Sequence, residues 1–445
     1  MRLRLFALWL FGSTLIPSHA DTTAIVGVNL IPMDRERIVK NQTVIVRDGV
    51  IVQLGDRRAI KIPEGARRID AKGRFLTPGL GEMHAHIPGA STPRPLTEKM
   101  LRLWVANGVT TIRGMLGEAS HLTLRGQVES GEVLGPHIVT AGPSLNGNSV
   151  TSPEAAVAAV REQKAAGYDF LKIHPGLKRD VFDALARTAD EVGIRFAGHI
   201  PTDVGLEHAI EKGYWSVEHN DGFIEALVKQ NAGVDLNQPT FFGLGLEGFV
   251  DESKLPALIE AARQRGVWFV PTESLMQSFV GDESLEALFA RPELKQLPAE
   301  MTQQWKAQLS QFRSNPGLTR QVRETFLALR RRILLSLHRA GVGIALGSDS
   351  IQIMNVPGYS THHELEQMVA AGLTPFEALQ LGTVNVAKFL GRESDSGTIS
   401  VGKRADLVLL TENPLKKISA IRSITAVMLR GAWLDRAALD KLLSS

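Results

Sequence analysis

The stretch GLGEMHAHIPG, residues 79–89, is an apolar run with two histidines one residue apart, and Pro-Gly pairs at 78–79 and 88–89 mark its two ends. Side chains on a β-strand alternate between its two faces, so His84 and His86 point the same way. Two imidazoles on one face can hold one metal ion. A strand with two hydrogen-bonded polar side chains would show the same pattern, so the distinction depends on whether other ligands converge there.

The middle of the chain alternates between short apolar runs, typical of buried strands, and longer amphipathic runs, typical of helices. Helices are expected after the Ser152-Pro153 capping pair, over residues 180–192 and over residues 319–340. Strands are expected near residues 80–87, 109–115, 137–143, 169–174, 194–200, 214–219, 267–273 and 343–349. Eight such units predict an α/β fold, a (β/α)8 TIM barrel over residues 77–390.

Both ends of the chain after residue 20 are rich in branched apolar residues. Residues 21–76 contain VIVRDGVIVQLG, in which Asp48-Gly49 favours a type I′ hairpin turn. Residues 391–445 contain AVMLRGAWL, in which Arg430-Gly431 can form a second hairpin. Two β-rich ends that flank one long middle segment predict a small β-sandwich domain built from both termini.

Residues 1–20 have the features of a secretory signal peptide. Arg2 and Arg4 precede an apolar run over residues 5–16, and Ser18-His19-Ala20 is a small-x-small cleavage pattern. The apolar run is shorter than the ~20 residues that span a bilayer. We therefore expect cleavage before Asp21, a periplasmic or secreted protein, and no membrane attachment after cleavage.

Composition narrows the chemistry. Residues 1–20 carry two of the 50 basic residues and none of the 47 acidic ones, so basic and acidic side chains nearly balance once they are removed. Nothing in that balance indicates nucleic acid binding, and a small-molecule partner is expected instead. The chain contains no cysteine, which excludes a thiol nucleophile, a disulfide and a thiolate metal site. Any bound metal must use nitrogen and oxygen ligands.

Ionisable side chains recur at the ends of the predicted strands. In a parallel barrel, inward-facing residues at the carboxyl ends of the strands converge on one site. Taken singly, each is compatible with a structural role, such as a hydrogen-bonded core histidine or an ion pair. Burying four histidines, a lysine and an aspartate around one axis is costly without a compensating cation, so the set predicts a metal site. Its members are His84, His86, Lys172, His199, His219 and Asp349.

Several segments together resemble the amidohydrolase superfamily, most closely its imidazolonepropionase-like and prolidase-like dipeptidase members. The resemblance covers nearly all of the chain after residue 20, and it implies metal-dependent hydrolysis on a (β/α)8 barrel with a terminal β-sandwich. The matching segments are TPGLGEMHAH (77–86), Gly198-His199, Glu218-His219, Gly347-Ser348-Asp349, ELEQMVAAGLTPFEALQLGTVNVAKFLG (364–391) and GTISVGKRADLVLL (397–410).

This resemblance implies two divalent ions, most simply zinc. His84 and His86 bind one ion together with Asp349, and His199 and His219 bind the second. Lys172 is then expected to be carboxylated and to bridge both ions, because burial lowers the pKa of a lysine and its neutral amine takes up CO₂. The alternative is an unmodified Lys172 paired with Asp349 in a one-metal site.

The expected activity is an exported amidohydrolase that cleaves a C–N bond in an amide or dipeptide, in a manner similar to Xaa-Pro dipeptidases. A metal-bridging hydroxide attacks the carbonyl, and Asp349 acts as general base and then as general acid. Thr272 or Ser348 is expected to support the ligands. Arg113, His174 and Tyr359 are candidate substrate contacts: Arg113 either holds a substrate carboxylate or forms an ion pair at the end of the barrel, and Tyr359 closes over the ligand.

Three alternatives stay open. The same bridging hydroxide would also attack a lactone, an ester or a phosphotriester. Cyclic-amide hydrolysis or deamination would accompany the one-metal site. A non-catalytic protein that binds metal or a ligand would leave no open coordination position on the ion. Two long connections, residues 220–251 and 274–318, are candidates for lids or binding loops.

Overall fold

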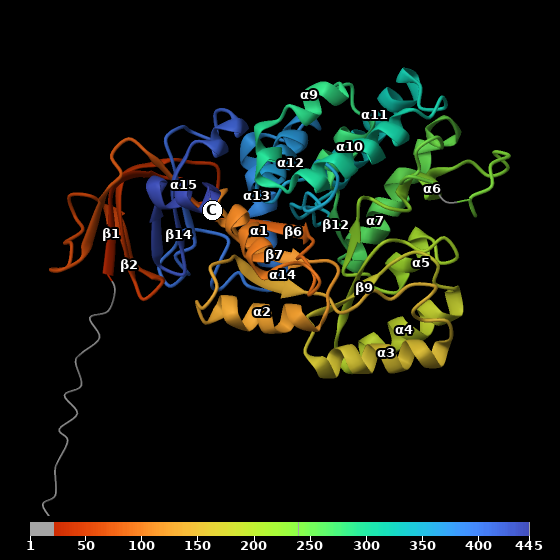
Figure 1. Cartoon of the computed structure of the whole chain (residues 1–445), viewed down its shortest axis with the longest axis horizontal. Coiled ribbons are helices and arrows are strands. Elements are labelled where there is room, and N and C mark those ends of the chain that lie inside the picture. The colour runs from red at the N-terminus through yellow and green to blue at the C-terminus, as the bar shows by residue number, and fades with distance from the viewer. Residues whose placement is uncertain (1–21, 239, 445) are drawn as a thin grey trace, which may run out of the picture.

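The computed structural model describes residues 22–238 and 240–444. The predicted signal peptide, residues 1–20, lies outside the described residues. Figure 1 shows a β-rich part at one side, where β1 and β14 lie, and a larger part in which helices surround short strands. Within the described ranges, no helix is both long and apolar enough to cross a membrane.

The β-rich part is one eight-stranded sheet to which both terminal segments contribute. Its order is β15-β14-β13-β5-β1-β2-β3, with β4 paired to β1, and the antiparallel pair of β13 and β5 joins the two termini. The strands are β1 Thr22–Leu30, β2 Val39–Arg47, β3 Val50–Asp56, β4 Arg67–Asp70, β5 Phe75–Pro78, β13 Leu407–Leu410, β14 Ile424–Leu429 and β15 Ala432–Asp435. The joint β unit is therefore confirmed, whereas its description as a β-sandwich stays a prediction.

Both predicted hairpins are present in this sheet. Asp48 and Gly49 connect β2 to β3 with φ values of 50° and 76°, as a type I′ turn requires. Arg430 and Gly431 connect β14 to β15 with φ values of 50° and 83°.

The larger part contains two parallel sheets whose strands match the predicted positions. Their orders are β6-β7-β8 and β12-β11-β10-β9. An isolated parallel bridge between Ala141 and Phe170 connects the chain after β8 to β9. The strands are β6 Leu80–Ala85, β7 Val109–Gly114, β8 His137–Thr140, β9 Phe170–Ile173, β10 Arg195–Gly198, β11 Ser216–Glu218 and β12 Trp268–Val270.

Residues 343–349 do not form the regular eighth strand that was predicted. The segment nevertheless runs between the two sheets, because its backbone bonds to Phe269 of β12 and to Met83 of β6. Asp349, the last residue of this segment, has a φ of 65°, so the chain leaves the extended conformation there. The two sheets do not by themselves establish a closed barrel, so the (β/α)8 barrel stays a prediction.

The predicted helices are confirmed. The hydroxyl of Ser152 accepts a hydrogen bond from the N–H of Ala155 and caps α3 Pro153–Ala166, and Thr319 caps α11 Arg320–Arg339 in the same way. The predicted helix 180–192 is α4 Arg179–Val192. The others are α1 Arg94–Ala106, α2 Ala119–Glu129, α5 Leu206–Glu211, α6 Phe223–Leu227, α7 Leu255–Arg265, α8 Glu273–Val280, α9 Leu285–Phe289, α10 Ala299–Arg313, α12 Tyr359–Ala370, α13 Pro375–Gly382, α14 Val384–Leu390 and α15 Arg436–Ser444, with short 3-10 turns η1 Glu247–Phe249, η2 Glu252–Lys254, η3 Pro292–Gln296 and η4 Ile418–Arg422.

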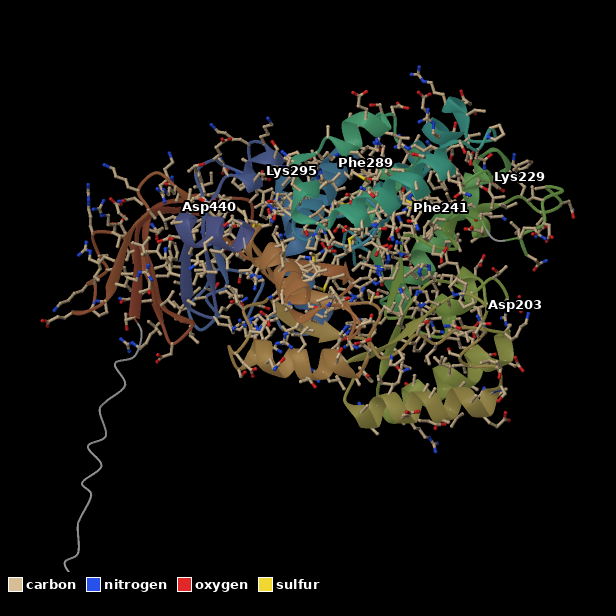
Figure 2. The ribbon with its side chains drawn as sticks, viewed as in Figure 1. Asp203, Lys229, Phe241, Phe289, Lys295 and Asp440 are labelled. Carbon is tan, nitrogen blue, oxygen red and sulfur yellow. The ribbon has the colours of Figure 1, made fainter. Side chains whose placement is uncertain are left out.

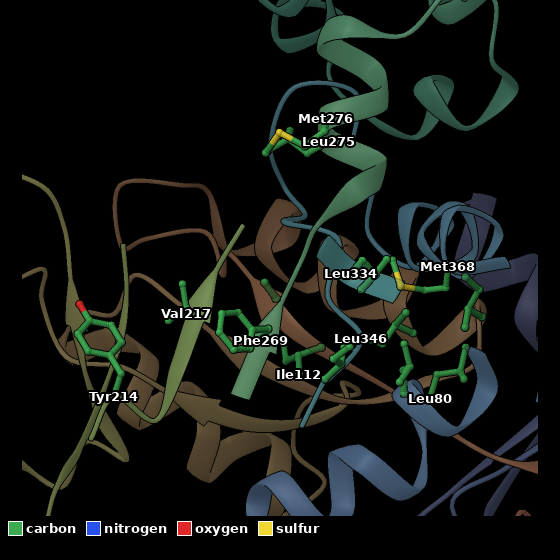
Figure 3. Close-up of a cluster of buried hydrophobic side chains, with 14 of the residues drawn as sticks. Leu80, Ile112, Tyr214, Val217, Phe269, Leu275, Met276, Leu334, Leu346 and Met368 are labelled. Carbon is green, nitrogen blue, oxygen red and sulfur yellow. The ribbon is translucent and has the colours of Figure 1, made fainter. Parts of the chain in front are cut away.

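One apolar cluster fills the space between the parallel strands and the helices (Figure 3). Leu80, Ile112, Val217, Phe269 and Leu346 come from five separate segments, and none exposes more than 2% of its surface. Interiors packed in this way are dense and have low compressibility. The cluster therefore holds the strand ends in fixed positions. Those ends carry the polar side chains described next.

Candidate metal centre

The predicted ligands lie at the carboxyl ends of the parallel strands. His84 belongs to β6 and Lys172 to β9, whereas His199 and His219 directly follow β10 and β11. Asp349 ends the segment 343–349, whose backbone bonds to both β12 and β6. His219 and Asp349 have φ values of 61° and 65°, which are uncommon for residues with a side chain and which turn the chain out of the strand direction.

His84, His86 and Asp349 form a close ligand group. Each offers one nitrogen or oxygen, and these atoms lie within 4.8 Å of one another. Oδ1 of Asp349 is 2.8 Å from Nε2 of His86 and 3.5 Å from Nε2 of His84. This oxygen nevertheless makes no aligned hydrogen bond among the described residues. Lone pairs that converge in this way surround a position suited to a cation.

The second predicted pair of histidines lies beside this group. The ring centroids of His84 and His219 are 4.6 Å apart, and those of His199 and His219 are 4.9 Å apart. His174 stacks on His199 at 5.0 Å, and its Nδ1 lies 2.6 Å from Oγ of Ser144. The structure thus brings the histidines together. The role of His174 as a substrate contact stays a prediction.

Lys172 is fully buried, and its Nζ has no hydrogen-bond partner among the described residues. Burial lowers the pKa of Lys172 to about 8, although Glu218 and Asp349 nearby favour the charged form. A lysine with this pKa is partly neutral near pH 7, and the neutral amine is the form that reacts with CO₂.

Each of three histidines is held from behind by an oxygen atom. A carboxylate at Nδ1 accepts the ring N–H, so that Nε2 keeps a lone pair for a metal, whereas a threonine hydroxyl there either accepts or donates. The pairs are His84 with Glu218 at 2.7 Å, His219 with Thr272 at 2.7 Å and His199 with Asp221 at 3.2 Å. The supporting contact from Thr272 was predicted, whereas those from Glu218 and Asp221 were not.

Arg113 does not reach a substrate. Its side chain is fully buried, and its Nη2 donates to Oε1 of Glu218 at 2.8 Å, while Nε donates to the carbonyl of Met83 at 2.7 Å and Nη1 to the hydroxyl of Ser216 at 2.8 Å. The predicted substrate contact is therefore wrong, and the alternative, an ion pair, is the arrangement found. Burial alone would raise the pKa of Glu218, but Arg113 and His84 outweigh it and hold this pKa at about 2.

Glu82 holds the segment that carries Asp349, and sequence analysis did not identify it. Its buried carboxyl group accepts hydrogen bonds from the backbone and hydroxyl of Ser348, at 2.5 and 2.9 Å, and from Thr361 at 2.6 Å. Burial raises the pKa of Glu82 to about 7 in spite of these bonds. Glu82 lies two residues before His84 on the same strand face, which is the signal that could have identified it.

Tyr359, predicted to close over the ligand, has other neighbours. It begins α12, bonds to Asn107 at the end of α1, and lies in the electrostatic range of Glu293 and Arg436. The structure therefore does not support a ligand contact for Tyr359.

The donor set fits divalent metal ions that accept nitrogen and oxygen ligands. Burial lowers the pKa of His84 to about 4 and that of His219 well below its usual value, so both imidazoles are neutral at pH 7. Burial opposes ionisation of Asp349, but His84 and His86 outweigh it and hold the pKa of Asp349 below its usual range. Neutral imidazoles with one carboxylate suit zinc. Within this group, Nζ of Lys172 and Oδ1 of Asp349 are buried and make no aligned hydrogen bond among the described residues, as expected of atoms that face a cation.

Comparison with known proteins agrees with this geometry. The model of the amidohydrolase family matches residues 75–434. Ochratoxinase from Aspergillus niger is 22% identical over 461 residues, which cover 92% of this chain and 85% of that protein.

Solved structures with the same fold include a bottromycin amidohydrolase, with a TM-score of 0.74 and 23% identity over 95% of this chain and 90% of that one. A Xaa-Pro dipeptidase with bound methionine has a TM-score of 0.66 and 20% identity, over 93% of this chain and 100% of the other. At these identities the likeness concerns the fold.

Proposed function

Since this chain belongs to the amidohydrolase family, we propose that it hydrolyses the C–N bond of a small-molecule amide with the help of bound divalent metal ions. The observation that carries the proposal is the convergence of His84, His86 and Asp349, whose ligand atoms lie within 4.8 Å of one another. Buried groups of this kind are costly to gather unless a cation compensates them.

Two ions, most simply zinc, would be held by the side chains of the cluster. His84, His86 and Asp349 would hold one, and His199 and His219 the other. Lys172 lies in the electrostatic range of both Asp349 and Glu218, and its buried amine has no partner among the described residues. Carboxylation would give this side chain two oxygens for both ions.

Bound ions of this type lower the pKa of water and polarise a carbonyl. Asp349 then supplies what the metals do not, a base that is ionised at pH 7. Its carboxylate takes the proton of the attacking water and delivers it to the leaving amine nitrogen. Glu82 keeps Asp349 in place through Ser348, whose backbone N–H and hydroxyl both bind the Glu82 carboxyl group.

Solved proteins with a similar fold support amide substrates. Two proteins with this fold are described as a Xaa-Pro dipeptidase and a bottromycin amidohydrolase, and both names refer to the cleavage of C–N bonds. The guanidinium of Arg113 is bound to Glu218 and is not free to hold a substrate carboxylate.

We further infer that the two parallel sheets and residues 343–350 form a closed (β/α)8 barrel over residues 77–390, beside a β-sandwich made from residues 21–76 and 391–445. Closure is supported by isolated parallel bridges from Ile344 to Phe269 and from Ser350 to Ala85. The pairing of β5 with β13 supports a single β domain built from both termini.

We also propose that residues 1–20 are cleaved and that the mature protein is periplasmic or secreted. The two arginines, the apolar run and the small-x-small pattern support this proposal. Expression in a bacterial host followed by N-terminal sequencing of the exported protein tests it, and an intact Met1 in a cytoplasmic product would refute it.

The activity is tested with purified, zinc-loaded protein and two substrate panels. The first contains N-acyl amino acids and Xaa-Pro dipeptides, and the second contains lactones, aryl esters and phosphotriesters. Turnover of amides that disappears on chelation and returns with zinc is the expected result. Turnover of the second panel alone would refute amide hydrolysis, and the absence of any turnover by a fully loaded protein would favour a binding role.

A further inference from the structure

A cavity of about 600 Å³ opens beside the candidate metal ligands, with His199 and Asp221 in its wall. A larger cavity, about 760 Å³, lies among residues at the amino ends of the strands, such as Leu80, His137 and Arg195, and contains none of the predicted ligands. Of these two cavities, the smaller one includes a predicted ligand in its wall. Its volume is in the range of sites that bind a small molecule.

Two phenylalanines form the apolar wall of this cavity. The ring of Phe242 lies 4.7 Å from the ring of His219 and 6.0 Å from that of His199, so it covers the imidazoles from the cavity side. Phe241, labelled in Figure 2, packs against Phe279 and Phe312 at 4.8 and 4.9 Å, which anchors the loop.

The backbone explains how Phe242 reaches the cluster. Its φ is 53°, which is uncommon for a bulky residue and is maintained only where the surroundings enforce it. Gly243 follows with a φ of 83°, and a Cβ there would lie 2.5 Å from Cβ of Ile224. The loop is thus pressed against α6 in a conformation that turns the Phe242 ring inward.

The charges in the cavity wall are mainly negative. Asp221, Glu225 and Glu207 line it, whereas Lys254 is the only lysine and no arginine is present in its described lining. The ammonium group of Lys254 is already bound to the carbonyls of Val228 and Ala226. A carboxylate entering here would find no free lysine or arginine side chain in the described lining, which differs from the guanidinium sites that recognise carboxylates.

Glu225 has one carboxylate oxygen to spare. Its Oε1 accepts a hydrogen bond from Thr240 at 2.8 Å, whereas its largely buried Oε2 has no partner among the described residues. A buried acceptor without a donor is costly, so a ligand that supplies a donor is favoured at this position.

We propose that this cavity binds the apolar part of the amide substrate, an aromatic or branched group next to Phe242, together with an ammonium substituent that donates to Glu225, and that it rejects a carboxylate. The inference rests on the proposed function in one respect, that the substrate is an amide. The binding preference itself does not require turnover.

The test measures binding of three matched ligands to zinc-loaded enzyme by calorimetry: 2-phenylethylamine, 2-phenylethanol and 3-phenylpropionate. The amine is expected to bind more tightly than the alcohol, because only the amine brings a positive charge to Glu225, and Glu225 is expected to repel the carboxylate. Replacing Glu225→Gln should weaken the amine about tenfold or more, because a charge-assisted hydrogen bond is lost. The same variant should leave the alcohol nearly unchanged and strengthen the carboxylate. Comparing each ligand between wild type and variant cancels its contact with zinc.

Two further variants complete the test. Phe242→Leu should weaken all three ligands, since they share the ring. Glu260→Gln, at an exposed pair with Arg263 on α7, is the control and should change none of them. Equal binding of the amine and the alcohol, no response to Glu225→Gln, or no binding of any ligand would overturn the inference. If the amine binds as expected but no amide is hydrolysed, the proposed function fails while the ligand preference stands.

Discussion

Oε2 of Glu218 lies 2.7 Å from Nδ1 of His84, and both side chains are withdrawn from solvent. The carboxylate accepts the imidazole N–H, which leaves the lone pair of Nε2 directed at Asp349, 3.5 Å away. Its other oxygen binds Arg113. A charge pair far from solvent thus determines which nitrogen of His84 is available to a metal.

Replacing Glu218→Gln should therefore weaken zinc binding about 10- to 100-fold, as the loss of a contact behind a ligand histidine does elsewhere. It should also lower the free energy of unfolding by about 3–5 kcal/mol, because Arg113 is left buried without a counterion. Chelator competition measures the first effect and urea denaturation the second. Glu191→Gln, at an exposed pair on α4, is the control. Zinc affinity equal to that of the wild type would contradict the role of Glu218.

Replacing Asp349→Asn should reduce kcat by about 10²- to 10⁴-fold, because the amide cannot accept the proton of the attacking water. One ligand oxygen remains, so much of the zinc should stay bound. Steady-state kinetics together with elemental analysis separate the two effects. Asp440→Asn, at an exposed pair with Arg436, serves as the control. Unchanged kcat with full metal content would exclude Asp349 as the base.

Replacing Lys172→Ala should reduce the zinc content per chain to about half that of the wild type, because the bridging ligand is lost while the histidines stay. Short-chain carboxylic acids should restore part of the zinc and the activity. A carbamate signal from isotope-labelled bicarbonate, seen by NMR in the wild type and absent in the variant, checks the modification directly. The exposed Lys229→Ala is the control. One zinc per chain in both forms would rule out a bridging carbamate.

Replacing Gly347→Ala should displace the segment that carries Asp349. A Cβ at this position would lie 2.5 Å from Cγ1 of Val270 and 2.7 Å from the backbone nitrogen of His84. We expect loss of zinc affinity together with lower thermal stability. Gly126→Ala is the matched control, since its Cβ would meet nothing within 4 Å and it lies inside α2, where alanine stabilises by about 0.5–1 kcal/mol. Full zinc affinity in Gly347→Ala would show that the segment can move without cost.

Stability should depend on pH through Glu364, which lies away from the ligands. Its carboxyl oxygens accept the N–H groups of Glu273 and Ser274, and burial raises its pKa from 4.5 to about 8. The folded protein thus keeps a proton that the unfolded chain releases above pH 4.5. The contribution of Glu364 is complete below that pH and is lost as pH rises towards about 8.

Denaturation of the wild type and of Glu364→Gln across this pH range measures the effect. As pH rises, the unfolding free energy of the wild type should fall relative to that of the variant, because glutamine cannot ionise. A difference that is independent of pH would show that Glu364 keeps the same protonation state throughout.

Local signals in the sequence were sufficient to predict most of the helices and strands and to place two candidate ligands on one strand face. Capping residues placed α3 and α11, the turn pairs at Asp48-Gly49 and Arg430-Gly431 placed two hairpins, and alternation put His84 and His86 on one strand face. Such features depend on neighbours in the chain, and they can be recognised without knowing what lies across the fold.

The tertiary structure alone decided which polar groups meet. Arg113 and Tyr359 looked suited to a substrate, yet the guanidinium is bound to Glu218 and the phenol to Asn107. The chain before Asp349 looked like an eighth strand; it does bond to β12 and to β6, but only through isolated bridges, and it turns at Asp349 with a positive φ. Partners more than a hundred residues away set these outcomes. Because burial makes an unpaired charge so costly, a side chain's role follows from the group it finds inside the fold, and the order of residues along the chain does not specify that group.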